Sequence, residues 1–180
     1  DLVGGMMALI LFSPVMLVTA ILIKATSPGP VIFCQERVGL HNKPFKMYKF
    51  RSMAVQSAAK EKSQWTTPGD PRVTPIGRFI RKTSIDELPQ LFNILKGEMT
   101  FVGPRPTLVS EVEKYNSYQR QRLGVKQGLT CFWQCSGRNN IGFEEWVALD
   151  LKYIKTRGIW TDIKILLKTV SAVLRMDGAC

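Results

Sequence analysis

The longest apolar segment of the chain lies at its N-terminal end. From Leu2 to Ile23 the sequence reads LVGGMMALILFSPVMLVTAILI and contains no charged residue. A helix of this length is long enough to cross the hydrocarbon core of a bilayer. The segment is also too long for the apolar core of a signal peptide, and no A-x-A cleavage site follows it. The pattern therefore predicts a membrane-associated helix.

Ser13 and Pro14 interrupt this apolar segment near its middle. Proline removes a backbone hydrogen bond and bends a helix, although membrane helices tolerate it. Two interpretations follow: a kinked helix that crosses the bilayer, or a helix that breaks at Ser13-Pro14, enters one leaflet and returns to the same face. In both, the basic remainder of the chain is expected on the cytoplasmic side, where lysine and arginine near a membrane segment are retained.

Shorter periodic segments follow the apolar helix. Residues 31–39 and 44–53 have the composition of two strands, which a turn at His41-Asn42 would join into a hairpin. Helical periodicity is expected in 75–81, 85–95, 143–155 and 159–176. The sequence therefore predicts a mixture of helices and short strands.

The C-terminal helix predicted over 159–176 is amphipathic. Lys164, Lys168 and Arg175 interrupt its apolar face, and Trp160 lies in its first turn. Such a helix either packs on the core of the domain or lies at a lipid interface, with its basic residues near the headgroups. The sequence favours neither interpretation over the other.

The charge of the chain limits its partners. Lys and Arg total 25 against 14 Asp and Glu, which gives a formal net charge of +11. This excess indicates an anionic partner: nucleic acid, a phosphorylated substrate or a membrane surface. No DNA- or RNA-reading motif is present, which argues against nucleic acid. The single histidine, His41, excludes mechanisms that need a histidine pair, and the cysteines show no C-x-x-C spacing.

Two adjacent carboxylates stand at the start of a predicted helix, in KTSIDELPQLF (82–92). Ser84 and Glu87 fit a capping box, and Asp86 suits the positive end of the helix dipole. The same position also suits chemistry, because a helix N-terminus keeps a carboxylate ionised and Mg²⁺ can bridge it to substrate phosphates. In a chain without a catalytic histidine, an ionised aspartate is a credible nucleophile for phosphoryl transfer. One helix start can serve both roles.

Arginine in restrained loops supplies positive charge. Arg105 stands between Pro104 and Pro106, so its guanidinium can bind a phosphate by two hydrogen bonds at small entropic cost. Neither G-x-x-x-x-G-K-[ST] nor G-x-G-x-x-G is present. Each further arginine is by itself more often a surface charge. The further arginines in turn-rich segments are Arg37, Arg51, Arg78, Arg81 and Arg138. Beside an acid pair and a membrane anchor, they favour a phosphate-bearing substrate.

Long stretches of the sequence resemble the bacterial sugar transferase family, the monotopic phosphoglycosyl transferases that start capsule, O-antigen and exopolysaccharide assembly. The likeness is most specific in DPRVTPIGRFIRKTSIDELPQLFNILKGEMTFVGPRP (70–106), with further matches in SPVMLVTAILIKATSPGPVIFCQERVG, FKMYKFRSM and GLTCFWQCSGRNN. It implies an α+β fold: a mostly helical small catalytic domain with a short β-hairpin, an N-terminal re-entrant membrane helix and amphipathic interfacial helices.

The resemblance also implies how the chain is divided and where it acts. Residues 1–24 would be a re-entrant membrane anchor broken at Ser13-Pro14, and residues 25–180 a catalytic domain. The implied location is the cytoplasmic face of the bacterial inner membrane, in contact with the inner leaflet of the bilayer. The oligomeric state stays open, with a homo-oligomer among the alternatives.

The implied reaction moves a sugar 1-phosphate from a UDP-sugar to undecaprenyl phosphate and releases UMP, through a covalent phosphosugar-aspartate. Carried onto this chain, Asp86 is the nucleophile and a Mg²⁺ ligand, and Glu87 completes the Asp-Glu dyad. Arg105 binds the nucleotide or its phosphates. The other implied substrate-binding residues are Lys49, Arg51, Arg81 and Arg138.

Two other classes of protein remain as alternatives. One is a membrane-bound glycosyltransferase that moves only the sugar and releases UDP, although no separate general base stands out for it. The other is a non-catalytic, membrane-anchored module that binds anionic lipid or polymer through its basic surface. In that case Asp86 and Glu87 only cap a helix.

Overall fold

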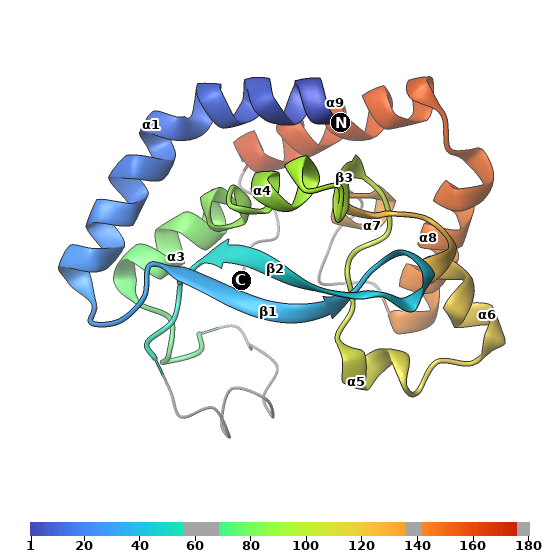
Figure 1. Ribbon diagram of the computed structural model, residues 1–180, viewed down its shortest axis with the longest axis horizontal. Helices are drawn as coiled ribbons and strands as arrows, with labels where there is room; N and C mark the ends of the chain where they lie inside the picture. Colours follow the sequence, from blue (N-terminus) through green and yellow to red (C-terminus); the bar gives the residue numbers. More distant parts are fainter. Residues whose placement is uncertain (56–68, 136–141, 176–180) are drawn as a thin grey trace.

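The computed structural model of the chain describes residues 1–55, 69–135 and 142–175. Helices surround two small sheets (Figure 1). The strands are β1 (Ile32–Val38), β2 (Pro44–Phe50), β3 (Met99–Val102) and β4 (Gln127–Thr130). The α-helices are α1 (Leu2–Thr26), α3 (Pro75–Lys82), α4 (Gln90–Leu95), α5 (Val109–Val112), α6 (Ser117–Arg120), α7 (Phe132–Cys135), α8 (Phe143–Thr156) and α9 (Ile159–Arg175). The short 3₁₀ helices are η1 (Leu40–Asn42), η2 (Ile85–Glu87) and η3 (Gln121–Gly124). The mixture of helix and strand that the sequence predicts is confirmed.

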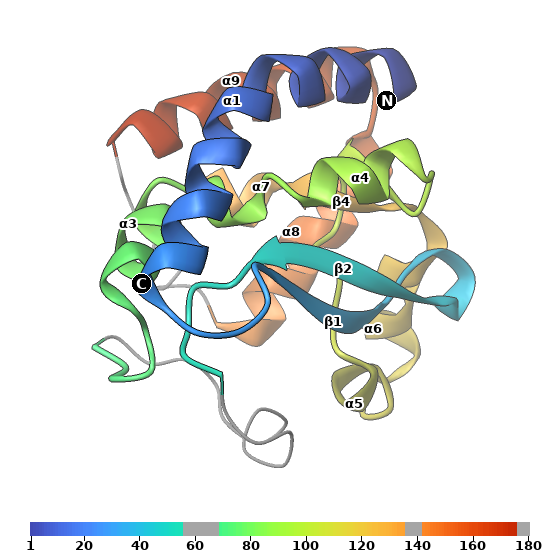
Figure 2. The same cartoon turned by 60° about the vertical axis from the view of Figure 1, so that its left-hand side comes forward.

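The N-terminal helix α1 is continuous, with Pro14 inside it. Proline has no N–H to donate to the carbonyl group four residues earlier, which here belongs to Ile10. The Ser13 hydroxyl donates to that carbonyl oxygen at 2.8 Å, so a side chain replaces the missing backbone bond. Figures 1 and 2 show that the helix is bent. The interruption expected at Ser13-Pro14 therefore takes the form of a bend in an unbroken helix.

Both ends of α1 pack against the body of the protein. Near its start, a Cβ added to Gly5 would lie 3.1 Å from Leu95 Cδ2, so α1 approaches α4 closely. Near its end, Ile23 is fully buried in a cluster with Phe50 of β2 and Ile80 of α3. The apolar segment that the sequence predicts to be an anchor is therefore held on the folded body at two separate points.

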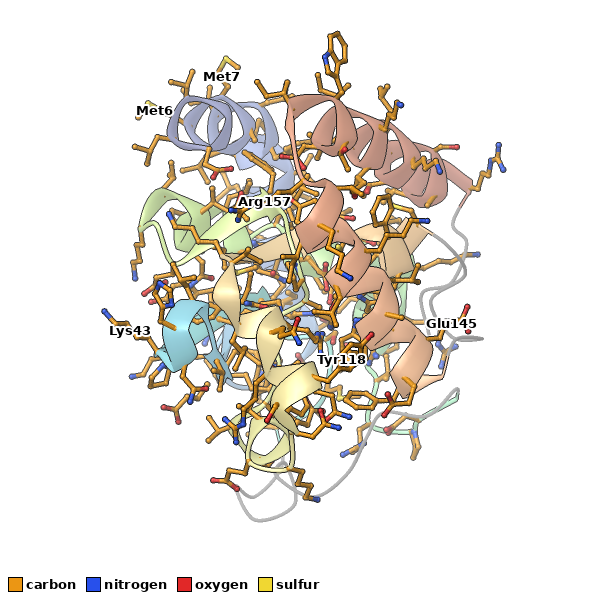
Figure 3. The ribbon with its side chains drawn as sticks, turned by 90° about the vertical axis from the view of Figure 1, so that its right-hand side faces the viewer. Met6, Met7, Lys43, Tyr118, Glu145 and Arg157 are labelled. Atoms are coloured by element: carbon orange, nitrogen blue, oxygen red, sulfur yellow. The ribbon has the colours of Figure 1, made fainter. Side chains whose placement is uncertain are left out.

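The outer face of α1 is apolar and exposed. The helix is long and apolar enough to cross a membrane by length and composition, and 17% of its most apolar window is buried. The first part of α1 runs beside α9 at one side of the molecule, and Met6 and Met7 point outward there (Figure 3).

Helix α9 buries Ile165 in the core. Its exposed apolar residues are Ile159, Trp160, Ile163, Leu166, Leu167 and Val170.

Strands β1 and β2 form the predicted antiparallel hairpin, in which Cys34 lies opposite Tyr48. The connection holds His41 and Asn42 in the left-handed region, at φ 54° and 65°, a conformation that His and Asn adopt more readily than most residues. Alternate residues of β1 are exposed and half-buried. Because side chains alternate between the two faces of a strand, this pattern turns Arg37 toward the interior.

Strands β3 and β4 form a short parallel pair that positions the loop after β3. A Cβ added to Gly128 would lie 2.0 Å from the backbone nitrogen of Gly103, a distance that no side chain tolerates. The Gly128 N–H also donates to the Pro104 carbonyl oxygen at 2.9 Å. Glycine at this crossing permits the close approach, and the approach fixes the start of the loop that carries Arg105.

Candidate active site

The two adjacent carboxylates lie on η2, a single 3₁₀ turn. The helix predicted over 85–95 is split into η2 and α4, with Pro89 between them. Ser84 precedes η2 in the left-handed region at φ 57°, and its side chain makes no capping hydrogen bond. The predicted capping box is wrong, because a capping serine needs extended backbone. Backbone strain of this kind costs about 1–3 kcal/mol and clusters at functional sites.

Asp86 is a buried carboxylate, with 9% of its surface exposed. Its pKa is raised to about 6, and burial is the largest cause. The Glu87 charge also raises the pKa, whereas the charges of Lys49, Arg81 and Arg105 lower it and offset part of the effect of burial. A carboxyl group with this pKa is mostly ionised at pH 7.5, although it has lost most of its hydration. A poorly hydrated carboxylate among cations is suited to attack a phosphorus atom.

Glu87 connects two of the surrounding cations. Its Oε1 accepts a hydrogen bond from Lys49 Nζ at 2.7 Å and lies 3.7 Å from Arg105 Nη1. Lys49 comes from β2, Glu87 from η2 and Arg105 from the loop after β3, so three segments distant in sequence meet here. The three side chains are 16%, 23% and 29% exposed, respectively. A substrate can therefore reach this group from solvent.

Aromatic rings lie behind Arg105. Its guanidinium carbon is 5.7 Å from the centre of the Trp133 ring, within the range of a cation–π contact. Trp133 packs on Trp146 with ring centroids 5.2 Å apart. Trp146 in turn lies 4.3 Å from the Arg122 guanidinium, which forms a buried ion pair with Asp150. The rings thus connect Arg105 to the core beside α8 and limit its positions on one side.

The remaining predicted binding residues differ in their surroundings. Arg81 of α3 contributes positive charge to the buried carboxylate of η2. Arg51 is buried, and its guanidinium donates to the backbone carbonyl oxygens of Ser27 and Pro28. These bonds tie the end of α1 to the segment after β2 and favour a structural role over the predicted substrate contact. Arg138 lies outside the described residues.

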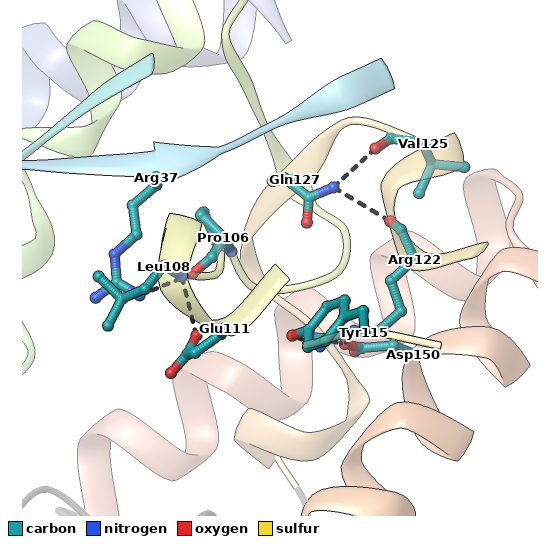
Figure 4. A network of polar contacts seen from close by, with 9 residues as sticks. All are labelled: Arg37, Pro106, Leu108, Glu111, Tyr115, Arg122, Val125, Gln127 and Asp150. Atoms are coloured by element: carbon teal, nitrogen blue, oxygen red, sulfur yellow. Dashed lines mark hydrogen bonds and ion pairs between the residues drawn. The ribbon is translucent and has the colours of Figure 1, made fainter. Parts of the chain in front are cut away.

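Arg37 of β1 reaches the same loop, although the sequence indicated it only as one arginine among several. Its Nη1 donates to the Pro106 carbonyl oxygen at 3.2 Å (Figure 4). The pKa of Arg37 is lowered to about 10, mainly by burial and next by the Arg105 charge. Arginine is seldom buried without a partner. The strand alternation of β1, which turns this position inward, is the sequence signal that could have identified it.

The acid pair fits part of a magnesium site. Mg²⁺ that acts on phosphorylated substrates usually binds one or two carboxylates, and substrate phosphates and water complete its six ligands. Asp86 and Glu87 supply adjacent carboxylates on one turn. Within residues 1–55, 69–135 and 142–175, no group of three or more His, Cys, Asp or Glu is placed to hold a metal ion. The donor set therefore suits a cation that shares its ligands with a bound phosphate.

Comparison with known proteins relates the chain to enzymes that act on a lipid carrier. It is 45% identical over 194 residues to the undecaprenyl-phosphate galactose phosphotransferase of Salmonella typhimurium, an alignment that covers 99% of the chain and 40% of that protein. It is 44% identical over 178 residues to the UDP-glucose:undecaprenyl-phosphate glucose-1-phosphate transferase of Escherichia coli, which covers 94% of the chain and 38% of that protein. The chain thus spans about two fifths of the length of these relatives.

A shorter relative matches over most of its own length. The uncharacterized sugar transferase EpsL of Bacillus subtilis is 42% identical over 178 residues, which cover 99% of the chain and 87% of that protein. A family model described as bacterial sugar transferase matches residues 1–176. This match includes α1, the hairpin, the acid pair and the Arg105 loop. The chain belongs to the bacterial sugar transferase family.

Proposed function

We propose that the chain transfers a sugar 1-phosphate from a UDP-sugar to undecaprenyl phosphate or another polyprenyl phosphate and releases UMP. This transfer would be the first membrane step in the assembly of a bacterial polysaccharide or glycoconjugate. The observation that carries the proposal is the buried Asp86, whose pKa is raised to about 6 while three cations surround it. The printed names of the relatives from Salmonella typhimurium and Escherichia coli support the substrate classes.

The proposed reaction consists of two displacements at one phosphorus atom. In the first, an Asp86 oxygen attacks the phosphorus that bears the sugar, the P–O bond to UMP breaks, and UMP leaves with the bridging oxygen. In the second, an oxygen of the polyprenyl phosphate attacks the same phosphorus, and the bond to Asp86 breaks. The carboxylate is regenerated, and the sugar is joined to the lipid through a diphosphate. Neither step needs a proton transfer, which suits a chain whose single histidine, His41, lies in the hairpin turn.

The cations around Asp86 have electrostatic roles in this reaction. Lys49, Arg81 and Arg105 stabilise the negative charge that spreads over the phosphoryl oxygens in the transition state. Glu87 orients Lys49 and Arg105 through the contacts described above. Asp86 and Glu87 would also hold Mg²⁺, which when bound neutralises phosphate charge.

Helices α1 and α9 fit a position at the membrane surface, where the lipid acceptor is fixed. Their neighbouring outer faces expose many large apolar side chains, an arrangement that marks membrane or protein interaction sites. A helix that crossed the bilayer would have to leave the body at one end, whereas α1 packs on it at both Gly5 and Ile23. We therefore propose that α1 is a re-entrant helix in the cytoplasmic leaflet of the inner membrane and that α9 lies along the interface.

Nucleotide analysis tests the proposed activity. The purified chain in nanodiscs with Mg²⁺ and undecaprenyl phosphate should release UMP from at least one member of a UDP-sugar panel. Asp86→Asn should lower the rate by about 1,000-fold or more, as expected for loss of a covalent nucleophile, whereas Glu113→Gln on the surface should have no effect. Release of UDP would instead indicate transfer of the sugar alone. If a folded, lipid-bound protein released no nucleotide, the non-catalytic alternative would be favoured.

The membrane arrangement has a separate test. Single cysteines at Asp1 and at Lys24, in a background without the native cysteines, are labelled by a membrane-impermeant maleimide in intact cells and in inverted vesicles. A re-entrant α1 predicts that both positions react only in inverted vesicles. Reaction of the two positions from opposite sides would show that the helix crosses the bilayer.

A further inference from the structure

The hydrogen bonding of Arg37 is incomplete. A guanidinium has five N–H donors, and two of those of Arg37 have acceptors: Nη1 donates to the Pro106 carbonyl oxygen and Nη2 to Gln35 Oε1, at 3.2 and 2.6 Å. The buried Nε has no hydrogen-bond partner among the described residues. No ion pair in the described part of the chain includes Arg37. A half-buried cation with unused donors costs stability unless an anion completes its contacts.

The surroundings of Arg37 bring a second cation close to it. The Arg105 charge lowers the pKa of Arg37, while the Glu111 and Glu87 charges raise it. One carboxylate oxygen of Glu111 accepts a hydrogen bond from the Leu108 N–H at 2.9 Å, at the start of α5 (Figure 4). The two guanidinium groups therefore repel each other across the loop that joins β3 to α5. A ligand with two linked negative charges would relieve this repulsion.

The backbone keeps Arg37 in this position. The Val38 N–H donates to the Thr107 carbonyl oxygen at 2.9 Å, next to the bond from Arg37 to Pro106. Strand β1 is thus fastened to both residues that follow Arg105. The Trp133 ring also limits the movement of Arg105. Both guanidinium groups thus have contacts within the protein that restrict their positions, and such preorganisation reduces the entropic cost of binding.

We propose that Arg37 and Arg105 together bind the diphosphate of the nucleotide donor. The proposal rests on the proposed function, to which it adds a second phosphate-binding group. Two guanidinium groups match the two linked phosphates of a nucleoside diphosphate sugar, because each offers paired N–H donors to phosphate oxygens. Arg105, beside Glu87, would then bind the phosphate that is transferred, and Arg37 the phosphate that leaves with UMP.

Binding of inorganic pyrophosphate and of UDP, measured by calorimetry on the full chain in detergent, tests the role of Arg37. Arg37→Met should weaken both affinities about 10- to 100-fold, the range expected for hydrogen bonds to charged groups. Arg37→Lys, which keeps the charge but not the paired donors, should fall between the wild type and Arg37→Met. Lys46→Met is the matched control, because Lys46 lies on the exposed face of the same hairpin opposite Glu36. It should bind both ligands like the wild type.

A double variant separates ligand binding from a purely structural role. If Arg37 only positions the loop, Arg37→Met should cause no further loss of pyrophosphate binding in an Arg105→Met background. If Arg37 contacts phosphate itself, the double variant should bind more weakly than either single variant, and its melting temperature should rise less when pyrophosphate is added. Unchanged pyrophosphate binding in Arg37→Met, or no further loss in the double variant, would overturn the inference.

The same measurements distinguish this inference from the proposed function. If pyrophosphate binding depends on Arg37 but no UDP-sugar yields UMP, the proposed function fails while the anion site remains. If UMP is released normally and Arg37→Met retains wild-type affinity for pyrophosphate and UDP, only the inference about Arg37 fails. If Arg37→Met does not fold, Arg37→Lys decides the outcome, because equal affinity of Arg37→Lys and the wild type would contradict recognition by paired donors.

Discussion

Removing the charge of Asp86 should stabilise the folded protein while it abolishes catalysis. An ordinary aspartate has a pKa of 3.8, and burial raises that of Asp86 to about 6. A carboxyl group with a higher pKa in the folded state binds its proton more tightly there. The stability it contributes is fully present below pH 3.8 and is lost as the pH rises through about 6. Above pH 6, the ionised carboxylate therefore lowers the free energy of unfolding.

The size of this effect follows from the two pKa values. At 1.36 kcal/mol per pH unit, the difference between about 6 and 3.8 corresponds to about 3 kcal/mol above pH 7. Asparagine has nearly the shape of the uncharged acid, so Asp86→Asn should raise the free energy of unfolding by up to about 3 kcal/mol at pH 7.5. The gain should be about half as large at pH 5, where the folded wild type is mostly protonated. For a chain of this size, 3 kcal/mol corresponds to about 6–12 °C in melting temperature.

Thermal unfolding in detergent and chelator, at pH 7.5 and pH 5, measures the effect without bound cation or substrate. Asp70→Asn is the matched control. Hydrogen bonds from Arg72 hold the pKa of Asp70 at about 2, so the stability that Asp70 contributes is present above pH 3.8 and lost only as the pH falls through about 2. Its replacement should lower the melting temperature at both pH values. An unchanged or lower melting temperature for Asp86→Asn at pH 7.5, or an equal gain at pH 5, would refute the reasoning.

Three further predictions concern the reaction, the Arg105 loop and the membrane face. The rate of UMP release in Mg²⁺ should fall at acidic pH as Asp86 becomes protonated, and this fall should begin below pH 6, because a bound cation favours the ionised carboxylate; a rate that stays constant down to pH 4 would contradict this. Gly128→Ala would place a Cβ 2.0 Å from a backbone nitrogen, and should cost about 1–3 kcal/mol of stability and about 100-fold in rate. Gly124→Ala, which would meet no atom within 4 Å, should change neither quantity, and equal effects of the two variants would refute the close-approach argument. Leu167→Gln on α9 should weaken liposome binding about tenfold, because a buried leucine contributes about 1.5–3 kcal/mol; Lys43→Gln on the hairpin turn is the control (Figure 3), and equal flotation of both would contradict an interfacial α9.

Local sequence patterns predicted the elements whose structure depends on neighbours in the chain. The β1–β2 hairpin was foreseeable because both segments have the composition of strands and a His-Asn turn joins them. The predicted helix over 85–95 was wrong as a single element. Ser84 adopts a left-handed conformation and Pro89 immediately precedes a second helix, so the acid pair lies on a separate 3₁₀ turn. Ser84 followed by Glu87 matches the usual residues of a capping box, so the sequence favours a regular helix start there. The left-handed backbone of Ser84 cannot be recognised from the residue types.

The arginines show what local patterns could not predict. Arg51 and Arg37 both belong to the hairpin region, yet Arg51 donates to Ser27 and Pro28 while Arg37 reaches the Arg105 loop. The contact of Arg37 joins residues 69 positions apart, and only tertiary packing decides it. The C-terminal helix is a similar case: the sequence left open whether it packs on the core or lies at a lipid interface. In the structure α9 buries Ile165 in the core and also exposes large apolar side chains.

Trapping the covalent intermediate would test the central claim most directly. The protein is mixed with a UDP-sugar that supports turnover, in Mg²⁺ but without a polyprenyl phosphate acceptor, then quenched and digested. Mass spectrometry of the peptide with Asp86 should show the added mass of a sugar phosphate, formed together with one equivalent of UMP and discharged when undecaprenyl phosphate is supplied. Asp86→Asn should show neither product. An unmodified peptide accompanied by normal turnover, or an adduct that persists when acceptor is added, would contradict a mechanism in which Asp86 is the nucleophile.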